Sequence, residues 1–500
     1  MDLSPGFDAF EKGWNAGQNQ LVTLRLTADL DTPVSLMLKL AEAEPLSFML
    51  ESVTGGEVRG RYSIVGMKPD LIWECRSGHA RVNRNARFSE DWQDDERPAL
   101  DSLRALIAES RMQMPPDVPA AAVGLFGYLG YDMIRLVEHL PNVNPDPLNL
   151  PDAMLIRPSV VAVLDGVKGE VTLCAPAWHE DGVPARAAYA RAAERVMDAL
   201  RSLDRLPAEP RALGDSGGIG EPRSNFTRDA YLAAVDTAKD YIRAGDIFQC
   251  VPSQRWAIDF PLPPFALYRS LRRTNPSPFM FFLNMGGFQI VGASPEILVR
   301  LRDGEVTIRP IAGTRPRGAT EAEDKALEAD LLSDEKELAE HLMLLDLGRN
   351  DVGRVAKIGT VHPTEEFIIE RYSHVMHIVS NVVGELRDGE DALSALLAGL
   401  PAGTVSGAPK VRAMEIIDEL EPEKRGVYGG AVGYFAANGE MDMCIALRTG
   451  VVKDGTLYVQ SGGGVVYDSD PAAEYQETVN KSRAMIRAAE GAAGFVRGNR

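Results

Sequence analysis

Two acidic stretches place carboxylates at helical spacing. A helix that begins at Ser333 or Asp334 would carry Glu337, Glu340 and His341, with an apolar stripe of Leu338, Leu342 and Leu345. A second helix, begun by Asp470-Pro471, would present on one face Glu474, Glu477 and Lys481. One carboxylate from each helix suits Mg²⁺, which completes its coordination with waters and substrate oxygens. Spacing alone, however, favours a solvated acidic face for both helices.

Three further patterns could carry chemistry, and each has a structural reading beside it. The glycine-rich residues 461–464 would let backbone N–H groups approach an anion, or would form a hairpin bend. Residues 403–410 resemble a phosphate-binding loop but lack its Gly-Lys-Ser/Thr order. His377 lies in an apolar stretch, where a histidine more often completes a core than acts in catalysis.

The elements that must position these residues alternate between strands and helices. Residues 157–164 and 170–174 predict paired strands around the turn at Asp165-Gly166, and residues 185–203 have helical spacing. Thr227 is the predicted N-cap of the next helix. Further strands are predicted at residues 287–291, 429–435, 444–452 and 456–460. This pattern predicts an α+β fold with a large antiparallel sheet.

A segment rich in Pro, Gly, Ser and Asp divides the chain. Residues 206–224 predict a linker between an N-terminal portion (1–205) and a C-terminal portion (225–495). Residues 214–218 spell Gly-Asp-Ser-Gly-Gly, the nucleophile motif of chymotrypsin-like proteases. A flexible loop cannot preorganise a catalytic triad, so we interpret this string as part of the linker.

Composition narrows the classes of function. The net charge of −19 over 500 residues argues against binding nucleic acid or an anionic membrane, which need a basic surface. A site for an anionic substrate would therefore need its own local positive charge. The four cysteines have no CxxC pair and fit reduced thiols. We read neither a signal peptide nor a membrane span and expect a soluble, cytoplasmic protein.

Several long strings, in order, resemble the chorismate-utilising enzymes. They are residues 245–249 (Gly-Asp-Ile-Phe-Gln), 292–296 (Gly-Ala-Ser-Pro-Glu), 310–318 (Pro-Ile-Ala-Gly-Thr-Arg-Pro-Arg-Gly), 340–351 and 406–410 (Ser-Gly-Ala-Pro-Lys). The resemblance runs from about residue 226 to 490 and continues more loosely through residues 50–52 and 127–132. It implies antiparallel β-sheets packed in a sandwich, with flanking helices.

Within this family, two positions favour the anthranilate synthases. The aminodeoxychorismate synthases usually carry a nucleophilic lysine where this chain has Ala312. The isochorismate and salicylate synthases use a lysine to activate water near the position of Gln249, and a neutral amide cannot act as that base. The resemblance therefore implies a lyase that converts chorismate and ammonia to anthranilate and pyruvate, the first step of tryptophan biosynthesis. An aminodeoxychorismate synthase, or a catalytically silent tryptophan sensor, is the alternative.

The resemblance also implies roles for individual residues. Glu340 and Glu477 would bind Mg²⁺, which reverses the preference drawn from spacing alone. Glu296 would be the general acid, and His377 would assist proton transfer. The residues implied to bind chorismate are Gly313, Thr314, Tyr428, Arg448, Gly462, Gly463, Gly464 and Lys481.

A regulatory site and a partner follow from the same resemblance. Tryptophan would bind to a pocket formed by Glu51, Ser52, Asn275, Pro278, Phe279, Met280 and Cys444 and inhibit the enzyme. Cys444 precedes Arg448 by four residues in one predicted strand, which would link the two sites. No cysteine lies in an amidotransferase nucleophile motif, so a separate glutamine amidotransferase subunit would supply the ammonia.

Overall fold

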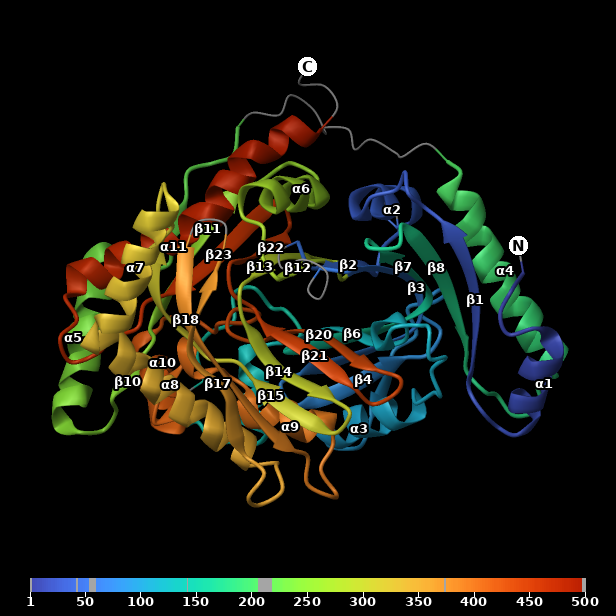
Figure 1. Cartoon of the computed structure of the whole chain (residues 1–500), viewed down its shortest axis with the longest axis horizontal. Helices are drawn as coiled ribbons and strands as arrows, with labels where there is room; N and C mark the ends of the chain where they lie inside the picture. The colour runs from blue at the N-terminus through green and yellow to red at the C-terminus, as the bar shows by residue number, and fades with distance from the viewer. Residues whose placement is uncertain are drawn as a thin grey trace.

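The computed structural model describes residues 2–41, 44–53, 60–141, 143–205, 218–372 and 375–496. Within these residues, 21 strands pair antiparallel in one continuous sheet that curls over on itself, with helices around it (Figure 1). A separate two-stranded sheet pairs β10 with β19. The predicted α+β class and the large antiparallel sheet are confirmed.

The N-terminal part contributes four helices and eight strands within the described residues. The helices are α1 (Phe7–Asn15), α2 (Pro33–Leu40), α3 (Ala99–Glu109) and α4 (Ala185–Leu203). The strands are β1 (Gln20–Thr27), β2 (Ser47–Glu51), β3 (Tyr62–Arg76), β4 (His79–Asn83), β5 (Gln93–Asp95), β6 (Gly124–Leu129), β7 (Ala153–Asp165) and β8 (Glu170–Ala177).

The C-terminal part contributes the remaining elements. The helices are α5 (Arg228–Ala244), α6 (Pro264–Thr274), α7 (Glu321–Ser333), α8 (Glu335–Gly353), α9 (Ala392–Gly399), α10 (Lys410–Leu420) and α11 (Pro471–Gly491). The strands are β9 (Arg223–Ser224), β10 (Gln249–Cys250), β11 (Ser253–Asp259), β12 (Phe279–Asn284), β13 (Gln289–Ser294), β14 (Ile297–Arg302), β15 (Glu305–Ile308), β16 (Ile311–Pro316), β17 (His362–Arg371), β18 (Val375–Glu385), β19 (Gly407–Ala408), β20 (Ala431–Ala436), β21 (Met441–Ile445), β22 (Thr449–Lys453) and β23 (Thr456–Gly462).

Both portions of the chain build the same sheet. β2 pairs with β12, and β6 pairs with β20, so N-terminal and C-terminal strands are joined within one hydrogen-bonded sheet. Much of the predicted linker, residues 206–217, lies outside the described residues, as does most of the protease-like string at 214–218. The domain boundaries therefore stay a prediction.

The alternation of side chains along β12 shows how the layers form. Phe281 points into a core enclosed between the curled halves of the sheet, together with Phe48 and Phe126. Its neighbours Met280 and Phe282 point to the opposite face, into the core under α2, α4, α6 and α11. A strand that is buried on both faces has no solvent-facing side and so needs no polar residue at alternate positions. This explains the apolar sequence Phe-Met-Phe-Phe-Leu of β12. The enclosed core gives the predicted sandwich.

Helix starts and the predicted hairpin agree with the local sequence signals. The side chain of Thr227 accepts a hydrogen bond from Ala230 N at the start of α5, and Asp470 caps α11 through Ala473 N. Asp334, not Ser333, caps α8, because Ser333 still belongs to α7. β7 and β8 pair as predicted, on either side of the turn at residues 166–169.

Two local predictions are wrong. Residues 444–452 do not form one strand: β21 ends at Ile445, β22 begins at Thr449, and Arg448 between them has φ 48°. A positive φ at a non-glycine residue ends regular pairing, so Cys444 lies on β21 while Arg448 lies in the connection before β22. Leu342 is half exposed, because the buried face of α8 runs through His341, Leu344 and Leu345 instead. No helix among the described residues is long and apolar enough to span a membrane.

Candidate active site

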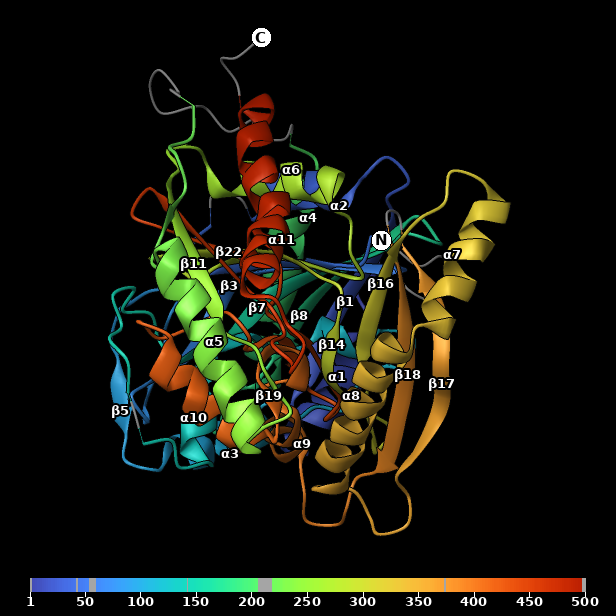
Figure 2. The same cartoon turned by 90° about the vertical axis from the view of Figure 1, so that its left-hand side faces the viewer.

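Helices α8 and α11 bring together the two predicted metal ligands, and Figure 2 shows both helices on the same side of the molecule. Burial raises the pKa of Glu340, and the negative charges of Glu337 and Glu477 raise it further. Burial and Glu477 likewise raise the pKa of Glu474. Partly buried carboxylates that repel one another are stabilised by a bound cation, so this arrangement suits Mg²⁺.

The described part of the chain has no group of three or more His, Cys, Asp or Glu side chains arranged to hold a metal ion by themselves. Two carboxylates from protein, with waters and substrate oxygens beside them, are a usual set for Mg²⁺. Glu340 and Glu477 would be those two ligands, because their negative charge and their oxygen donors match what Mg²⁺ prefers.

Gln249 lies against this acidic group. Its Nε2 donates a hydrogen bond to Glu340 Oε1 at 3.3 Å, while its buried Oε1 has no partner among the described atoms. A Cβ at Gly464 would lie 2.8 Å from Gln249 Nε2, so the glycine lets the backbone approach this amide. An unsatisfied buried acceptor is costly, and it indicates a place where a hydrogen-bond donor is bound.

The glycine-rich segment forms a wall of the same site. It does not make a hairpin: β23 ends at Gly462, and Val465 then bridges to Cys250. A Cβ at Gly462 would lie 3.0 Å from the Tyr428 hydroxyl, and one at Gly463 would lie 3.0 Å from Glu474 Oε2. Only glycines allow the chain to pass this close to the tyrosine and the carboxylate.

Lys481 joins α11 to the glycine-rich segment. Its Nζ lies 2.8 Å from Glu477 Oε1 and donates to Gly462 O at 3.0 Å. Its positive charge also acts on Glu296, whose pKa it lowers in part. Lys481 therefore lies between the predicted metal ligand and the predicted acid.

Glu296 is a buried carboxyl group placed directly after β13 in the loop to β14. Burial raises its pKa to about 8, although a hydrogen bond from Thr404 and the charge of Lys481 lower it in part. Thr404 Oγ1 lies 3.2 Å and 3.3 Å from the two carboxyl oxygens. Below pH 8 this group is mostly protonated, which is the state a general acid needs.

His377 on β18 is held by the neighbouring strand β16. Its Nδ1 lies 2.9 Å from Gly313 O and 3.1 Å from Thr314 Oγ1. A carbonyl oxygen can only accept, so Nδ1 carries the hydrogen and Nε2 keeps its lone pair. Burial lowers the pKa of His377, and the nearby charge of Arg448 lowers it further. The imidazole is thus kept neutral, with Nε2 as its basic atom.

Arg448 supplies positive charge to this side of the site. Burial lowers the pKa of its guanidinium, and no carboxylate within the described residues lies at ion-pair distance from it. Its backbone at φ 48° is a conformation that few non-glycine residues adopt, and the O of Arg448 accepts from Ala293 N at 3.2 Å. A partly buried guanidinium without a carboxylate partner suits the carboxylate of a ligand.

Tyr428 closes the site from the side of the glycine-rich segment. It is 6% exposed, and burial raises the pKa of its hydroxyl to about 12 while a backbone hydrogen bond from Gly462 lowers it in part. The phenol therefore stays protonated and keeps a hydrogen-bond donor in the site.

The predicted tryptophan-binding residues are also brought together. Glu51 at the end of β2 pairs with Met280 on β12, and Phe279 pairs with Ser294 on β13. The Nδ2 of Asn275, at the end of α6, is buried without a partner among the described atoms. Pro278 directly precedes β12. Cys444 lies on β21, and Ser294 hydrogen-bonds to its thiol.

The carboxylate of Glu51 is hydrogen-bonded within the protein in this arrangement. Arg272 donates to its two carboxyl oxygens at 2.6 Å and 3.0 Å, and Tyr268 donates to the first of them. Its carboxylate is therefore used within the protein, and it fixes the chain at Ser52. Residues 54–59, which follow, lie outside the described residues.

Sequence reasoning missed Thr404 as a site residue. It lies in the short 3-10 helix Gly403–Val405, inside the string that was set aside as a weak phosphate loop. Its contact with Glu296 joins residues that are 108 positions apart, and no local signal predicts such a pairing. The only sequence signal was that this string resembles a phosphate-binding loop without its full motif.

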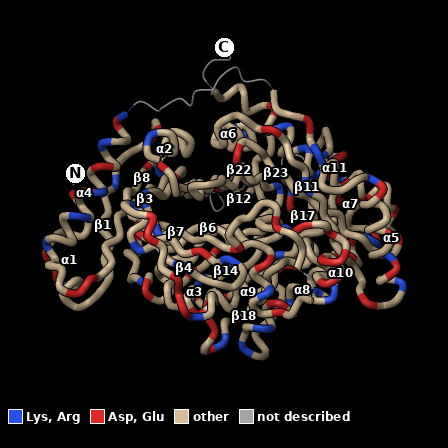
Figure 3. The backbone as a smooth tube through the Cα atoms, turned by 180° about the vertical axis from the view of Figure 1, so that it is seen from behind, with Lys and Arg blue, Asp and Glu red and all other residues tan. Residues whose placement is uncertain are grey.

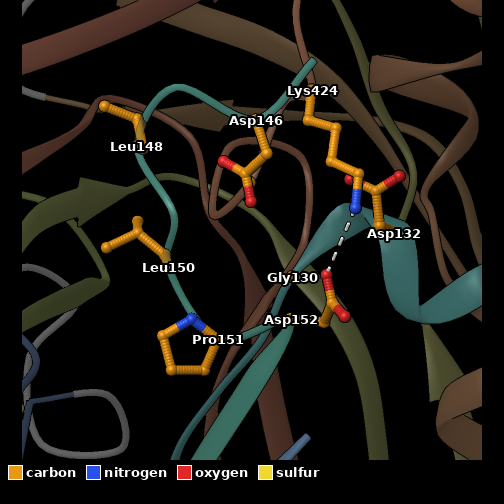
Figure 4. Close-up of a pocket in the computed structure, with 9 residues that line it drawn as sticks. Gly130, Asp132, Asp146, Leu148, Leu150, Pro151, Asp152 and Lys424 are labelled. Atoms are coloured by element: carbon orange, nitrogen blue, oxygen red, sulfur yellow. Dashed lines mark ion pairs between the residues drawn. The ribbon is translucent and has the colours of Figure 1, made fainter. Parts of the chain in front are cut away.

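A separate small cavity lies away from these residues, between the segment before β7 and the loop after α10 (Figure 4). Asp132, Asp146 and Asp152 line it together with Lys424, whose Nζ is 3.8 Å from Asp152 Oδ1. Over the described part of the molecule, acidic and basic residues are interspersed along the backbone trace (Figure 3). The positive charge of the site thus comes from single residues such as Arg448 and Lys481.

Comparison with known proteins agrees with this architecture. The family described as chorismate binding enzyme matches residues 68–487. Anthranilate synthase component 1 of Cereibacter sphaeroides is 79% identical over 492 residues, which cover 98% of each chain. That of Pseudomonas putida is 53% identical over 470 residues, covering 92% of this chain and 93% of the relative.

Two solved structures share the fold. The crystal structure of anthranilate synthase component I from Streptococcus pneumoniae superposes with a TM-score of 0.75 at 38% identity, over 92% of this chain and 99% of that one. The menaquinone-specific isochorismate synthase of Escherichia coli gives a TM-score of 0.72 at 18% identity, over 95% of each chain, a likeness of fold alone. The chain described here therefore belongs to the chorismate-binding enzyme family.

Proposed function

We propose that this chain is the ammonia-using component of an anthranilate synthase, which converts chorismate and ammonia to anthranilate and pyruvate in tryptophan biosynthesis. One observation carries the proposal. Glu296, kept protonated by burial, lies in one site with the carboxylates of Glu340 and Glu477 and with a glutamine, not a lysine, at position 249. The high identity to curated anthranilate synthase components supports it.

Chorismate, a dicarboxylate, is held by charge and by close backbone approach. Arg448 pairs with the enolpyruvyl carboxylate through its planar guanidinium. Glu340 and Glu477 would hold Mg²⁺, which would supply positive charge for the ring carboxylate. The walls of the site are Gly313, Thr314, Tyr428, Gly462, Gly463, Gly464 and Lys481.

Gln249 and Ala312 decide which nucleophile attacks. The unpartnered Oε1 of Gln249 is a buried acceptor, and ammonia is a donor of matching size. A neutral amide cannot take a proton from water, so it does not generate hydroxide. Ala312 on β16 offers no amine that could attack the ring in place of ammonia.

The two proton-transfer groups act at different steps. Ammonia attacks ring C2 as the C4 hydroxyl leaves, and Glu296 gives its proton to that oxygen so that water departs rather than hydroxide. His377 then assists the loss of the ring proton through Nε2, its free basic nitrogen, as pyruvate is eliminated and the ring becomes aromatic. Its lowered pKa keeps it neutral for this role.

A partner subunit is the expected source of ammonia. All four cysteines are free and buried, and burial raises the pKa of Cys75, Cys174 and Cys250 to about 12, so these thiols are poor nucleophiles. We therefore infer that a glutamine amidotransferase subunit supplies ammonia to this chain. The free thiols also support a reducing, cytoplasmic location.

The test is a product assay with the purified chain, chorismate, Mg²⁺ and an ammonium salt at mildly alkaline pH. Anthranilate fluorescence is expected, with little product when glutamine alone replaces ammonium. Adding tryptophan should suppress the signal. Aminodeoxychorismate, isochorismate or salicylate as the product would contradict the proposal, and binding of tryptophan without any turnover would identify a sensor instead.

A further inference from the structure

Arg425 lies buried behind the site, in the loop between α10 and β20. It is 3% exposed, and its Nε and Nη2 donate to both oxygens of Glu421, at distances from 2.6 to 3.2 Å. The same carboxylate also accepts from Ser253 N at 2.7 Å and from Ser253 Oγ at 2.8 Å. Glu421 therefore holds the guanidinium in one orientation.

The remaining donors of Arg425 hold two backbone carbonyls beside the site. Nη1 donates to Val405 O and Nη2 donates to Val251 O, both at 2.6 Å. Val405 directly follows Thr404, the residue that hydrogen-bonds to Glu296. Val251 precedes Pro252, whose carbonyl accepts from Gly463 N at 3.2 Å in the glycine-rich segment. Val405 is thus one residue from the hydrogen-bond partner of Glu296, and Val251 is one residue from the carbonyl that holds the glycine-rich segment.

The guanidinium of Arg425 lies over two aromatic rings. Arg425 Cζ lies 4.7 Å from the ring centroid of Tyr131 and 5.5 Å from that of Tyr428. A guanidinium stacks on such rings as a plane, which a lysine ammonium cannot imitate. The orientation of Tyr428, which closes the substrate site, therefore depends on the same cation.

Stability alone does not explain this arrangement. A buried ion pair often contributes no more to folding than an apolar pair of the same volume, because both charges must be stripped of water. What an apolar pair cannot do is hold two carbonyls and a tyrosine ring in one geometry. We propose that Arg425, oriented by Glu421, is a positioning residue that fixes Thr404, the glycine-rich segment and Tyr428 around the substrate; this rests on the proposed function.

The chain offers a matched control for the substitution Arg425→Lys. Arg157 on β7 is also buried and also pairs with carboxylates, Asp70 at 2.9 Å and Glu109 at 3.3 Å. Its guanidinium lies 4.5 Å from the ring centroid of Trp178, so the chemistry of the contact is similar. Arg157 lines no part of the site, and Arg157→Lys reports the general cost of such an exchange.

Both variants are assayed for anthranilate formation with ammonium, next to the wild type. Arg425→Lys should lower kcat/KM for chorismate at least about tenfold more than Arg157→Lys does. We expect both a lower kcat and a higher KM, at a thermal midpoint similar to that of Arg157→Lys. The alkaline limb of the kcat/KM profile should also move to higher pH in Arg425→Lys alone, because Thr404 no longer lowers the pKa of Glu296. Equal losses in the two variants, with an unmoved limb, would overturn the proposal.

If Arg425→Lys does not fold, the charge-balanced pair Glu421→Met with Arg425→Met takes its place. A folded double variant with kcat/KM at least about tenfold below wild type supports a positioning role, and a folded one with full kcat/KM overturns it. Failure of the proposed function can be told apart from failure of this inference, because the wild type would then form no anthranilate.

Discussion

Glu296 is a carboxylic acid whose role depends on keeping its proton. Burial raises its pKa to about 8 against an ordinary value of 4.5, so the acid form dominates at neutral pH. Turnover that needs this form should be full below the folded pKa and should fall as the pH rises through about 8. The measurement is the pH dependence of kcat/KM with ammonia held constant as the neutral species.

Glu296→Gln keeps the shape of the acid form but has no proton to give. It should lower kcat by about 100-fold or more, a loss typical of a missing general acid, while chorismate still binds. A glutamine variant that retained wild-type turnover, with the same fall near pH 8, would remove Glu296 from the mechanism.

The same carboxyl links pH to stability. The folded state binds its proton more tightly than the unfolded chain, so Glu296 favours folding below pH 4.5 and this contribution is lost between pH 4.5 and about 8. Glu296→Gln should therefore unfold with a smaller decline in stability across that window. Chemical unfolding of both proteins at several pH values measures the difference.

Helices α8 and α11 act as two rigid supports that present one carboxylate each. Glu340→Gln or Glu477→Gln should raise the Mg²⁺ concentration for half-maximal activity by about tenfold or more, equivalent to about 1.4 kcal/mol. Direct titration of Mg²⁺ in the presence of chorismate should show the same weakening. Exposed glutamates on the same helices give the controls, Glu335→Gln on α8 and Glu490→Gln on α11. Unchanged Mg²⁺ dependence in both site variants would contradict the assignment.

The sequence predicted these helices well at their starts and less well along their faces. Asp470 caps α11 through a hydrogen bond three residues away, and such short-range chemistry is readable from the sequence. The inner face of α8 is decided by its packing on β18: His341 is fully buried there, and its Nε2 lies 2.7 Å from Ser380 Oγ. A contact between residues 39 positions apart leaves no periodic signal, so Leu342 was wrongly placed inside.

The break between β21 and β22 was unpredictable for the same reason. Residues 444–452 predict one strand, yet Arg448 has φ 48° where the following residues pair with β13. Local propensity gives way where tertiary contacts fix the backbone. The resemblance to a family predicts roles for Glu296 and His377, but only the fold shows that Thr404 hydrogen-bonds to Glu296 and that Arg425 hydrogen-bonds to the carbonyl of the next residue, Val405.

At the scale of the whole molecule, the sheet places the predicted tryptophan-binding residues next to Glu296, the predicted general acid. β2, from the N-terminal part, brings Glu51 against Met280, and β12 continues the pairing to Ser294 on β13. Ser294 Oγ lies 3.3 Å from both the N and the O of Glu296 and also hydrogen-bonds to Cys444. A ligand that contacts Met280 and Cys444 would therefore displace the end of β13, which orients Glu296. This path replaces the single strand that was predicted to join Cys444 to Arg448.

Tryptophan and chorismate should accordingly oppose one another's binding. Linkage requires that the factor by which tryptophan weakens chorismate binding equals the factor by which chorismate weakens tryptophan binding. Ser52→Ala should leave kcat unchanged and raise the tryptophan concentration for half-inhibition by about tenfold. Saturating tryptophan should also raise the thermal midpoint of this variant by less than it raises that of the wild type. Calorimetric titration of tryptophan with and without chorismate and Mg²⁺ measures both factors, with phenylalanine as the control ligand. If tryptophan binds equally tightly with and without saturating chorismate, the pocket does not act through Glu296. A ligand that binds the chorismate-free and chorismate-bound states equally well cannot shift the equilibrium between them.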